Sequence, residues 1–401
     1  MSLSGLNILN CHEKIIIGSP VYQVMSSFFK KIQLLTSVLC ERPFPSVVDI
    51  NLTSKCNQKC VYCEIGQGVV RSEKTEKNVL DLNDLKWILD QMHQEKIPTL
   101  ILQGGEPFLF RDLFPVIEYA SKLGIDIVIT TNGMQIPKLR DDELNILKKA
   151  HCSLTVSIDS FNRETENLIR GVTNAFDNAV NGIKILIKHE IPVTIGTVIT
   201  KYNYQDIANL VKTANALGVF SVHFQPLINV SNYPEVNCIP EKNDMNLNHD
   251  HLERLNQEFE EILAFEQSHA IKTNTRILKK WIRQYVSFCS GSNSGNDFFF
   301  QCHLNRFFCF DLYNRIRINY YGEVLPCHFI HADISIHDDP DRSLVQTWNS
   351  SCRQVRISIK QKHYPRHCNG CVCSYDTNLF LSVIKHPLSN CAMIPWIVSK
   401  K

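Results

Sequence analysis

The segment Cys56-Asn57-Gln58-Lys59-Cys60-Val61-Tyr62-Cys63 places three cysteines on one short stretch with the spacing C-x3-C-x2-C. It follows a β-rich run at 47–52, which predicts a strand that ends just before the cysteines. Three thiolates on one tight loop can hold three corners of a cubane iron–sulfur cluster, which proteins normally hold with four cysteines. We therefore expect a cluster with three protein ligands, whose remaining iron is open to another molecule.

A zinc site is the main alternative interpretation of this loop. Structural zinc sites are closed by four protein ligands, usually as two C-x2-C or Cys/His pairs. The next cysteine after Cys63 is Cys152, so no second pair lies near the loop in the sequence. The spacing therefore favours an iron–sulfur cluster over zinc and over a chance grouping, which short motifs always allow.

The composition narrows the class of protein. The chain has 401 residues, of which 44% are hydrophobic, and this is enough for a sizeable core. Its 42 basic and 40 acidic residues give a formal net charge of +2, so electrostatics offers no case for nucleic acid or an anionic membrane as partner. No apolar run approaches the roughly 18–20 residues of a membrane span.

Cysteine usage and the N-terminus together predict a cytoplasmic protein. Asn7 and Asn10 interrupt the short apolar start, and no small-residue cleavage site follows, so we expect no signal peptide. In a reducing cytoplasm, clustered cysteines indicate metal binding rather than disulfides. Eleven of the 16 cysteines lie in two groups, three at 56–63 and eight in the last hundred residues, while the other five are scattered.

Strand-like and helix-like segments alternate between residues 46 and 230. Short β-rich runs lie at 47–52, 99–103, 126–131, 153–158, 193–200 and 221–225. Helical periodicity is clearest at 82–92, 113–122, 175–188 and 204–216. This alternation predicts an α/β fold with a parallel sheet, here a partial, TIM-like (β/α)6 barrel. In such a barrel, sites form at the carboxyl ends of the strands.

The cysteine loop resembles the signature of the radical S-adenosylmethionine (radical SAM) enzymes, including the aromatic Tyr62 before the last cysteine. The resemblance implies a 4Fe–4S cluster on Cys56, Cys60 and Cys63 and an open iron that chelates the methionine moiety of S-adenosylmethionine. Reductive cleavage would give a 5′-deoxyadenosyl radical that abstracts a hydrogen atom from a substrate. An electron donor such as flavodoxin or ferredoxin is implied. The cofactor carries this chemistry, while the protein supplies position and electrostatics.

Gly104-Gly105-Glu106 follows the second predicted strand and resembles the family motif that binds the methionine amino group. Glycines let a backbone approach a ligand closely, and a carboxylate can accept bonds from an ammonium group. A simple Gly-Gly turn is the alternative. The position of the motif after the three cysteines favours the cofactor-binding role.

Further residues near the ends of predicted strands are implied in binding S-adenosylmethionine. Ser157 and Asp159 share one strand face by alternation and resemble the ribose-binding motif, with a helix N-cap as the alternative. Arg170 would lie near the cofactor carboxylate, or else would be a surface charge. Ile199 would lie against the adenine, or else would be a core residue. Tyr62 completes the implied binding set.

The sequence on either side of the barrel predicts three further regions. Residues 1–45 form an N-terminal helical extension, and 231–300 form a helical linker or insert with one or two amphipathic helices at 252–288. The Ser/Gly/Asn-rich segment 290–296 is typical of a flexible linker. A small cysteine-rich domain, a β-hairpin plus a helix, is expected at 301–395.

The hairpin of this domain predicts a second metal site. Two strand-like runs flank a turn that contains Gly322, so a hairpin would bring Cys309 and Cys327 together. The pair Cys368-x2-Cys371 follows 41 residues after Cys327. Two plus two cysteines make a closed four-ligand site, which could hold zinc or an iron–sulfur cluster.

The same cysteines resemble the auxiliary-cluster domains of radical SAM enzymes, called SPASM in the full form and twitch in the shorter form. The resemblance implies a second 4Fe–4S cluster whose ligands are Cys309, Cys327, Cys368 and Cys371. The full form needs two more cysteines, but Thr377 and Leu381 occupy those positions here. This argues for one auxiliary cluster, with Cys373 and Cys391 as candidate ligands of a degenerate second site.

We therefore expect an oxidoreductase-like radical SAM enzyme with an auxiliary cluster that accepts an electron during dehydrogenation of a small alcohol or sugar. The alternative is modification of a ribosomally synthesised peptide or protein by crosslinking, epimerisation or formylglycine formation. An alternative of another class is a non-catalytic, metal-stabilised binding protein. The loop cysteines and Glu106 argue against the last, since a scaffold needs no open iron.

Overall fold

The computed structural model describes residues 43–68, 79–227, 245–290, 308–328, 330, 334–339, 341–365 and 368. Several predicted features lie outside these ranges. They are the N-terminal extension up to residue 42, most of the linker at 290–296, and the positions Cys371, Cys373, Thr377, Leu381 and Cys391.

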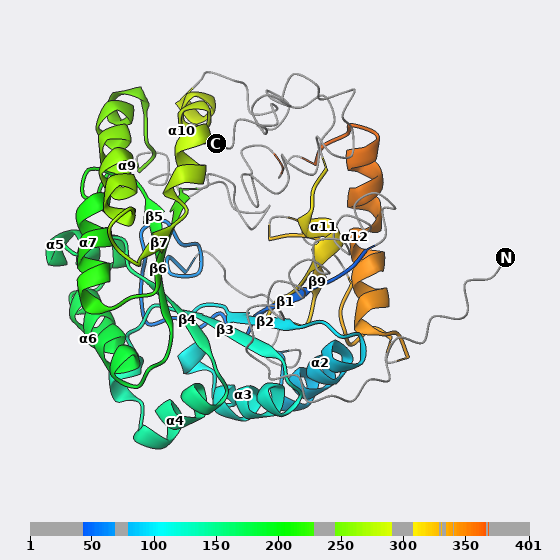
Figure 1. Cartoon of the computed structure of the whole chain (residues 1–401). Helices are drawn as coiled ribbons and strands as arrows, with labels where there is room; N and C mark the ends of the chain where they lie inside the picture. The colour runs from blue at the N-terminus through cyan, green and yellow to red at the C-terminus, as the bar shows by residue number, and fades with distance from the viewer. Residues whose placement is uncertain are drawn as a thin grey trace, which may run out of the picture.

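Six parallel strands alternate with helices, as the sequence predicted. The strands are β1 (Val47–Asn51), β2 (Thr99–Gln103), β3 (Asp126–Thr131), β4 (Ser153–Ser157), β5 (Val193–Ile199) and β6 (Ser221–Pro226). The helices between them are α2 (Leu82–Gln94), α3 (Leu113–Lys122), α4 (Asp141–Lys149), α5 (Arg163–Arg170), α6 (Ala175–Lys188) and α7 (Ile207–Leu217). Figure 1 shows these helices on the outer side of a curved sheet, so the predicted partial barrel is confirmed.

Each strand buries alternate side chains under the outer helices. Val48 and Ile50 of β1 are at most 1% exposed, whereas Val47 and Asn51 are half-buried. The other parallel strands of the barrel repeat this alternation. Each fully buried aliphatic side chain contributes about 1.5–3 kcal/mol, so the helix-facing layer supplies the core. The opposite faces of the strands look into the barrel.

The sheet extends beyond the six predicted strands at both ends. Its order is β7-β6-β5-β4-β3-β2-β1-β8-β9. At one end, β7 (Lys272–Thr273) pairs in parallel with β6. It lies between α9 (Leu252–Glu266) and α10 (Thr275–Ser290), so the amphipathic segment forms two helices. A two-residue strand is too short to show alternation in the sequence.

At the other end, the predicted hairpin is joined to the barrel. It consists of β8 (Arg315–Ile318) and β9 (Val324–Leu325), which pair antiparallel. The sequence did not predict that β8 also pairs in parallel with β1, from Val47↔Arg315 to Ile50↔Ile318. The auxiliary-cluster segment is thus continuous with the barrel sheet. Helix α12 (Leu344–Lys360) packs beside β9 at this end (Figure 1).

This pairing places the two cysteine groups at opposite ends of strand β1. The loop 56–63 follows β1 and lies at its carboxyl end. Cys309 precedes β8, which runs parallel to β1, and Cys327 follows the antiparallel β9. Both therefore lie near the amino end of β1. The strand between the two groups spans roughly 13 Å, from four steps of about 3.3 Å each.

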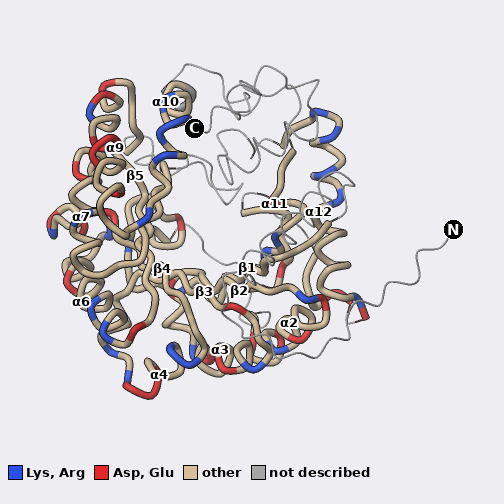
Figure 2. The backbone as a smooth tube through the Cα atoms, in the orientation of Figure 1, with Lys and Arg blue, Asp and Glu red and all other residues tan. Residues whose placement is uncertain are grey.

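The surface reflects the balanced composition. Figure 2 shows acidic and basic residues interspersed along the outer helices. Oppositely charged residues join neighbouring helices, such as Lys212 on α7 and Glu261 on α9. Exposed pairs of this kind contribute little to stability in water, so the fold depends on the buried apolar core.

Candidate cofactor and cluster sites

The cysteine loop is fixed by main-chain hydrogen bonds to the end of α5. The N–H of Lys59 donates to the carbonyl of Arg170 at 3.0 Å, and the N–H of Val61 donates to the carbonyl of Ile169 at 2.9 Å. The Gln67 amide donates to the carbonyls of Lys59 and Cys60. These bonds satisfy polar groups that the irregular loop could not pair within itself. The loop is therefore held before any ligand binds.

The three thiols of the loop have different surroundings. The Cys56 sulfur accepts from the Gln58 main-chain N–H at 3.4 Å and from the Asn132 amide at 3.8 Å. Cys60 is 8% exposed, and burial raises the pKa of its thiol to about 12. Cys63 is half-buried. The thiols are electrostatically coupled, since a charge on Cys63 raises the pKa values of both Cys56 and Cys60.

This donor set fits a cluster better than a single ion. Across the described ranges, no three His, Cys, Asp or Glu side chains converge as ligands of one metal ion. A cubane offers a separate iron atom to each cysteine, so its three ligands need not meet at one point. Amide donors to sulfur suit thiolates that carry negative charge. Cluster binding would displace the thiol protons, as for other metal-bound cysteines.

The two glycines after β2 pack against the backbone that leads into the cysteine loop. A Cβ atom on Gly105 would lie 2.2 Å from the carbonyl oxygen of Lys55, and one on Gly104 would lie 2.6 Å from that of Thr53. Gly104 also has φ +143°, which side chains rarely adopt. The N–H groups of Gly105 and Glu106 donate to Thr53 and Lys55, at 2.7 and 2.8 Å. The close approach that the glycines permit in this structure is therefore to the chain itself.

Glu106 is buried, with 0% of its surface exposed. One carboxylate oxygen accepts from the Thr131 hydroxyl at 2.7 Å and from the Phe108 N–H at 3.2 Å. The other accepts from the Asn132 N–H at 2.8 Å. Burial raises the pKa of Glu106, and these three hydrogen bonds act in the opposite direction. The carboxylate thus joins the ends of β2 and β3, and its role as ligand of the methionine amino group stays a prediction.

Asp159 and Arg170 form a buried ion network, and their contacts with S-adenosylmethionine stay predictions. An Arg170 Nη atom lies 3.1 Å from Asp159, and Nε lies 2.9 Å from Glu166. The Tyr62 hydroxyl donates to Asp159 at 2.6 Å. The other Asp159 oxygen accepts from the Val198 N–H at 2.8 Å. Both carboxylate oxygens of Asp159 are therefore engaged within the protein.

The guanidinium of this network remains charged. Burial alone lowers the pKa of Arg170, but Asp159, Tyr62 and Glu166 raise it well above its ordinary value. The sequence analysis did not identify Glu166. Its signal was the i, i+4 spacing to Arg170 on α5, a helix that the apolar pattern did not reveal. The alternative that Arg170 is a surface charge is wrong, because the residue is 4% exposed.

The other predicted cofactor contacts lie in two environments. Ser157 is half-buried on the inner face of the sheet, at the last position of β4. Ile199 is fully buried at the end of β5 and lines a cavity of about 10 Å³ with Leu247 and Tyr285. A core position for Ile199 is thus observed. Its contact with adenine stays a prediction.

The inner face of the sheet carries polar groups between the two cysteine regions. Asp49 accepts from the Gln103 amide at 2.6 Å and lies 3.4 Å from Arg315, 3.9 Å from Arg317 and 3.7 Å from His328. Burial raises the pKa of Asp49, whereas the two guanidinium groups lower it. These side chains come from β1, β2, β8 and the residue after Cys327. The pairing of β8 with β1 brings them together.

On the opposite side of the barrel, β6 presents His223 and Gln225 on its inner face. Both are exposed to solvent, unlike the buried Phe224 between them. The surrounding protein nevertheless lowers the pKa of His223. A side chain that solvent reaches inside a partly enclosed space can be both exposed and partly desolvated, and desolvation lowers the pKa of a histidine. His223 is therefore a neutral imidazole inside the barrel at pH 7.

Three of the predicted auxiliary ligands lie in the described ranges: Cys309, Cys327 and Cys368. Burial raises the pKa of Cys309 well above its ordinary value, with further contributions from Asp311, Cys368 and Cys327. The Cys309 thiol is thus electrostatically coupled to Cys368 and Cys327, and the role of the three cysteines as ligands of one cluster stays a prediction. The sequence analysis assigned no role to Cys352 on α12, which is 0% exposed and electrostatically coupled to Cys327.

Helix α12 is fastened to this region by Arg356. Its guanidinium donates to the carbonyl of Leu312, with the Nε atom at 2.9 Å, and to Asn349 at 2.9 Å. The same group lies 4.9 Å from the ring centroids of both Tyr313 and Trp348. Such a cation between two aromatic faces stabilises by about 0.5–2 kcal/mol per contact. The segment after Cys309 is thus held against α12.

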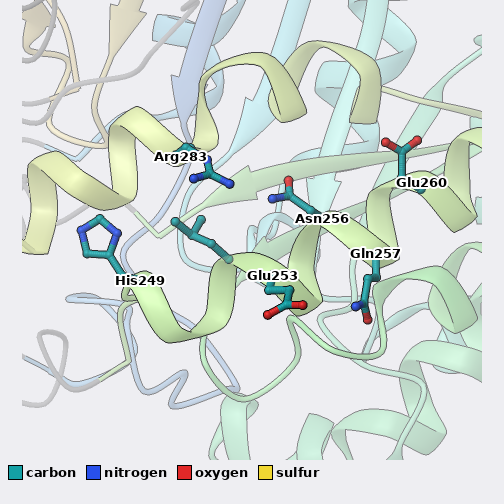
Figure 3. A pocket seen from close by; sticks show the side chains of 7 residues that line it. His249, Glu253, Asn256, Gln257, Glu260 and Arg283 are labelled. Atoms are coloured by element: carbon teal, nitrogen blue, oxygen red, sulfur yellow. The ribbon is translucent and has the colours of Figure 1, made fainter.

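A pocket of about 570 Å³ lies apart from these sites (Figure 3). It lies between α9 and α10. The short 3-10 helix η4 (His249–His251), which comes directly before α9, contributes His249 to its lining. Its polar lining residues are His249, Glu253, Asn256, Gln257, Glu260 and Arg283. None of the predicted site residues lines it, so it offers no support for a role in the chemistry.

Comparison with protein families gives the class of the protein. A model of the radical SAM superfamily matches residues 50–214. The chain therefore contains a radical SAM domain over these residues. A model of SPASM, an iron–sulfur cluster-binding domain, matches residues 309–372, so the chain is a radical SAM protein with a SPASM domain. Its cofactors are S-adenosylmethionine, a 4Fe–4S cluster and an auxiliary iron–sulfur cluster in the SPASM domain. These matches favour iron–sulfur clusters over zinc at both sites.

Curated relatives match part of the chain. An AdoMet-dependent heme synthase of Methanosarcina barkeri is 32% identical over 180 residues, which are 45% of this chain and 50% of that protein. A probable GTP 3′,8-cyclase of Saccharolobus islandicus is 30% identical over 176 residues, which are 43% of this chain and 54% of that protein. The chain thus spans about half the length of these relatives.

Solved structures share the fold. SuiB of Streptococcus suis, bound to its precursor peptide SuiA, aligns with a TM-score of 0.58 and 18% identity over 87% of this chain and 75% of that one. The protein anSMEcpe with bound AdoMet aligns with a TM-score of 0.55 and 17% identity over 86% of this chain and 97% of that one. Within the described ranges, every helix is too short or too polar to pass through a bilayer.

Proposed function

We propose that the protein is a radical SAM oxidoreductase that dehydrogenates a small alcohol or sugar held inside the barrel. The main support is the pairing of β8 with β1, since it sets the two cysteine regions at opposite ends of adjacent strands. Polar side chains of the inner face lie between them, including Asp49 and Gln103. A substrate in this position would lie within reach of both regions.

In this proposal, Cys56, Cys60 and Cys63 hold the first 4Fe–4S cluster. When bound, this cluster and S-adenosylmethionine supply abstraction of one hydrogen atom from substrate carbon. The chain's own part is to fix the loop, which the bonds from α5 and Gln67 achieve. Gln58 and Asn132 would offset the charge of the Cys56 thiolate through their hydrogen bonds.

The proposed cofactor contacts are assigned by accessibility. Ser157 lies on the inner face and could meet a ribose hydroxyl directly. Glu106 accepts three hydrogen bonds, only one of them at the oxygen that faces Asn132, so that oxygen could also accept from the methionine amino group. Asp159 could likewise use the oxygen that accepts from Val198. Gly104 and Gly105 act by placing Glu106 beside the cysteine loop.

The auxiliary cluster in this proposal is held by Cys309, Cys327, Cys368 and Cys371. Four cysteine ligands would leave no iron open to substrate, so the cluster would supply one-electron transfer. Oxidation of an alcohol to a ketone removes two hydrogens. One would leave as a hydrogen atom to the 5′-deoxyadenosyl radical, and the other as a proton to a base and an electron to the auxiliary cluster. His223 is our candidate for accepting the proton, because it is neutral and accessible inside the barrel. A flavodoxin or ferredoxin would supply the reducing electron.

Iron and sulfide analysis of anaerobically reconstituted protein tests the assignment. We expect about eight irons per chain for two 4Fe–4S clusters. The variant Cys56→Ala/Cys60→Ala/Cys63→Ala should retain about four irons and lose reductive cleavage of S-adenosylmethionine. The variant Cys309→Ala/Cys327→Ala should also retain about four and still cleave the cofactor. Wild-type protein that never cleaves S-adenosylmethionine would support the non-catalytic alternative.

Peptide modification is the second candidate function. Its specific support is the structural likeness to peptide-bound SuiB over 87% of this chain. The two candidate functions differ in which deuterated substrate transfers its deuterium to 5′-deoxyadenosine. Incubation with deuterated sugar alcohols should give deuterated 5′-deoxyadenosine in the first case. Deuterium transfer only from a peptide encoded near the gene would favour the second.

A further inference from the structure

We propose that Arg170 positions Cys60 and sets the reduction potential of the cluster on the cysteine loop. This inference rests on the proposed function of the loop, because it requires a cluster on Cys60. It assigns to Arg170 a role other than contact with the carboxylate of S-adenosylmethionine. Arg170 is therefore a positioning residue that acts through a cysteine.

Each edge of the Arg170 guanidinium faces a partner. Nε donates a hydrogen bond to Glu166 at 2.9 Å. Nη2 lies 3.1 Å from Asp159 as an ion pair without hydrogen-bond geometry, and Nη1 lies 4.0 Å from the sulfur of Cys60. The side chains of Arg170, Asp159 and Glu166 are at most 5% exposed. Two carboxylates hold the planar group in one orientation. The remaining edge is directed at the cysteine.

The same helix end also fixes the backbone around Cys60. The carbonyls of Ile169 and Arg170 accept from Val61 and Lys59, the residues on either side of Cys60. Gly171 follows with φ +67°, and a Cβ there would lie 2.3 Å from the carbonyl of Lys59. Side-chain and main-chain contacts thus converge on one cysteine. Neither Cys56 nor Cys63 has such contacts with α5 among those the described residues show.

The sign of the electrostatic effect follows from the charges. One-electron reduction adds negative charge to a cluster and its sulfur ligands. A fixed positive charge beside one sulfur stabilises the reduced form and raises the potential. The effect is weakly screened because the group is buried. Glu166 carries the opposite charge in the same network, so removing its charge must shift the potential the other way.

These opposite signs define the test. The potential of the loop cluster is measured by EPR-monitored redox titration of the full chain, reconstituted anaerobically without S-adenosylmethionine. The relevant signal is the one absent from Cys60→Ala. In Arg170→Gln, the ratio of reduced to oxidised loop cluster at a fixed applied potential should fall at least tenfold. This corresponds to a reduction potential about 59 mV lower for a one-electron couple. Glu166→Gln should shift the potential upward.

Two further variants separate charge from folding. Arg170→Lys keeps the positive charge and should leave the potential near that of wild type. Arg170→Gln/Glu166→Gln removes one charge of each sign and should also remain near wild type, even where Arg170→Gln alone folds poorly. Binding of S-adenosylmethionine is measured in parallel by equilibrium dialysis.

An unchanged potential in Arg170→Gln, together with weaker binding of S-adenosylmethionine, would overturn the inference in favour of direct cofactor binding. Shifts of the reduction potential in the same direction in Arg170→Gln and Glu166→Gln would overturn it as well. Loss of local structure would shift both variants alike, whereas loss of opposite charges would shift them in opposite directions. Failure of the proposed function looks different. In that case wild-type protein would show no cluster signal that depends on Cys60.

Discussion

The main-chain N–H of Asn132 donates to the carboxylate of Glu106 at 2.8 Å, and this bond joins the ends of β3 and β2 directly beneath the cysteine loop. Asn132 also reaches the loop through its side chain, which donates to Asn57 at 2.7 Å. Glu106 therefore links the sheet to the loop through one neighbour. The motif that contains it has a structural task as well as a proposed cofactor-binding task.

Replacement of this carboxylate should destabilise the fold. In Glu106→Gln, an amide NH2 must face one of the donors that now bind the two oxygens. An unsatisfied or opposed buried donor costs about 1–3 kcal/mol. We expect a loss of this size in the free energy of unfolding, measured by urea denaturation of the metal-free protein. Glu118→Gln on α3 is a control on an exposed residue and should change little.

The glycine beside Glu106 gives a second prediction. Gly105→Ala places a methyl group 2.2 Å from the Lys55 carbonyl, so the backbone before Cys56 must move. We expect loss of the iron bound by the loop, with the auxiliary iron retained. Gly124→Ala is the matched control, because a Cβ there meets nothing within 4 Å. It should cost about 1 kcal/mol through its positive φ and leave the iron content unchanged.

The third prediction concerns pH. Enclosure lowers the pKa of His223 below 6.5, so the imidazole is already neutral at pH 7. A base must be deprotonated to act, and its rate therefore falls only when the pH drops through this lowered pKa. Product formation per 5′-deoxyadenosine released should be flat from pH 7 to 8 and fall only at a pH below 6.5. His223→Gln should lose this dependence and most product while still cleaving S-adenosylmethionine. A retained acid limb in this variant would exclude His223 as the base.

The fourth prediction tests the contact between α12 and the segment after Cys309. Arg356→Met removes the bonds to the Leu312 carbonyl and the charge between Tyr313 and Trp348. The hairpin should then bind its cluster less firmly. We expect about four irons to remain, all of them sensitive to mutation of the loop cysteines. Arg353→Met on an exposed position of α12 should keep both clusters.

Local patterns in the sequence predicted the barrel strands to within one or two residues. Strands such as β3 and β5 are rich in Val, Ile and Thr, and this local composition indicates a strand without knowledge of its neighbours. Pairing between β1 and β8 carries no local signal, because the partners lie far apart in the chain. The predicted hairpin was confirmed, but its attachment to the barrel had to come from the structure.

The site was predicted less completely, for identifiable reasons. Alternation placed Asp159 on the face of Ser157, yet β4 ends at Ser157, so the rule no longer applies two residues later. Helix α5 was missed because its sequence Arg-Glu-Thr-Glu-Asn is polar and shows no apolar stripe. Glu166 was missed with it. Cysteine spacing, in contrast, needs no secondary structure to be recognised.

The attachment of β8 to β1 also affects how the chain assembles during synthesis. The Ser46 hydroxyl donates to Asn314 at 2.6 Å across a separation of 268 residues. At about 5–20 residues per second, a ribosome needs roughly 13 to 54 s to make this stretch. Throughout that time β1 can pair only with β2, and its other edge remains open to unwanted partners. Strand β1, the first strand of the sheet in chain order, thus gains its second neighbour only after about 268 further residues have been made.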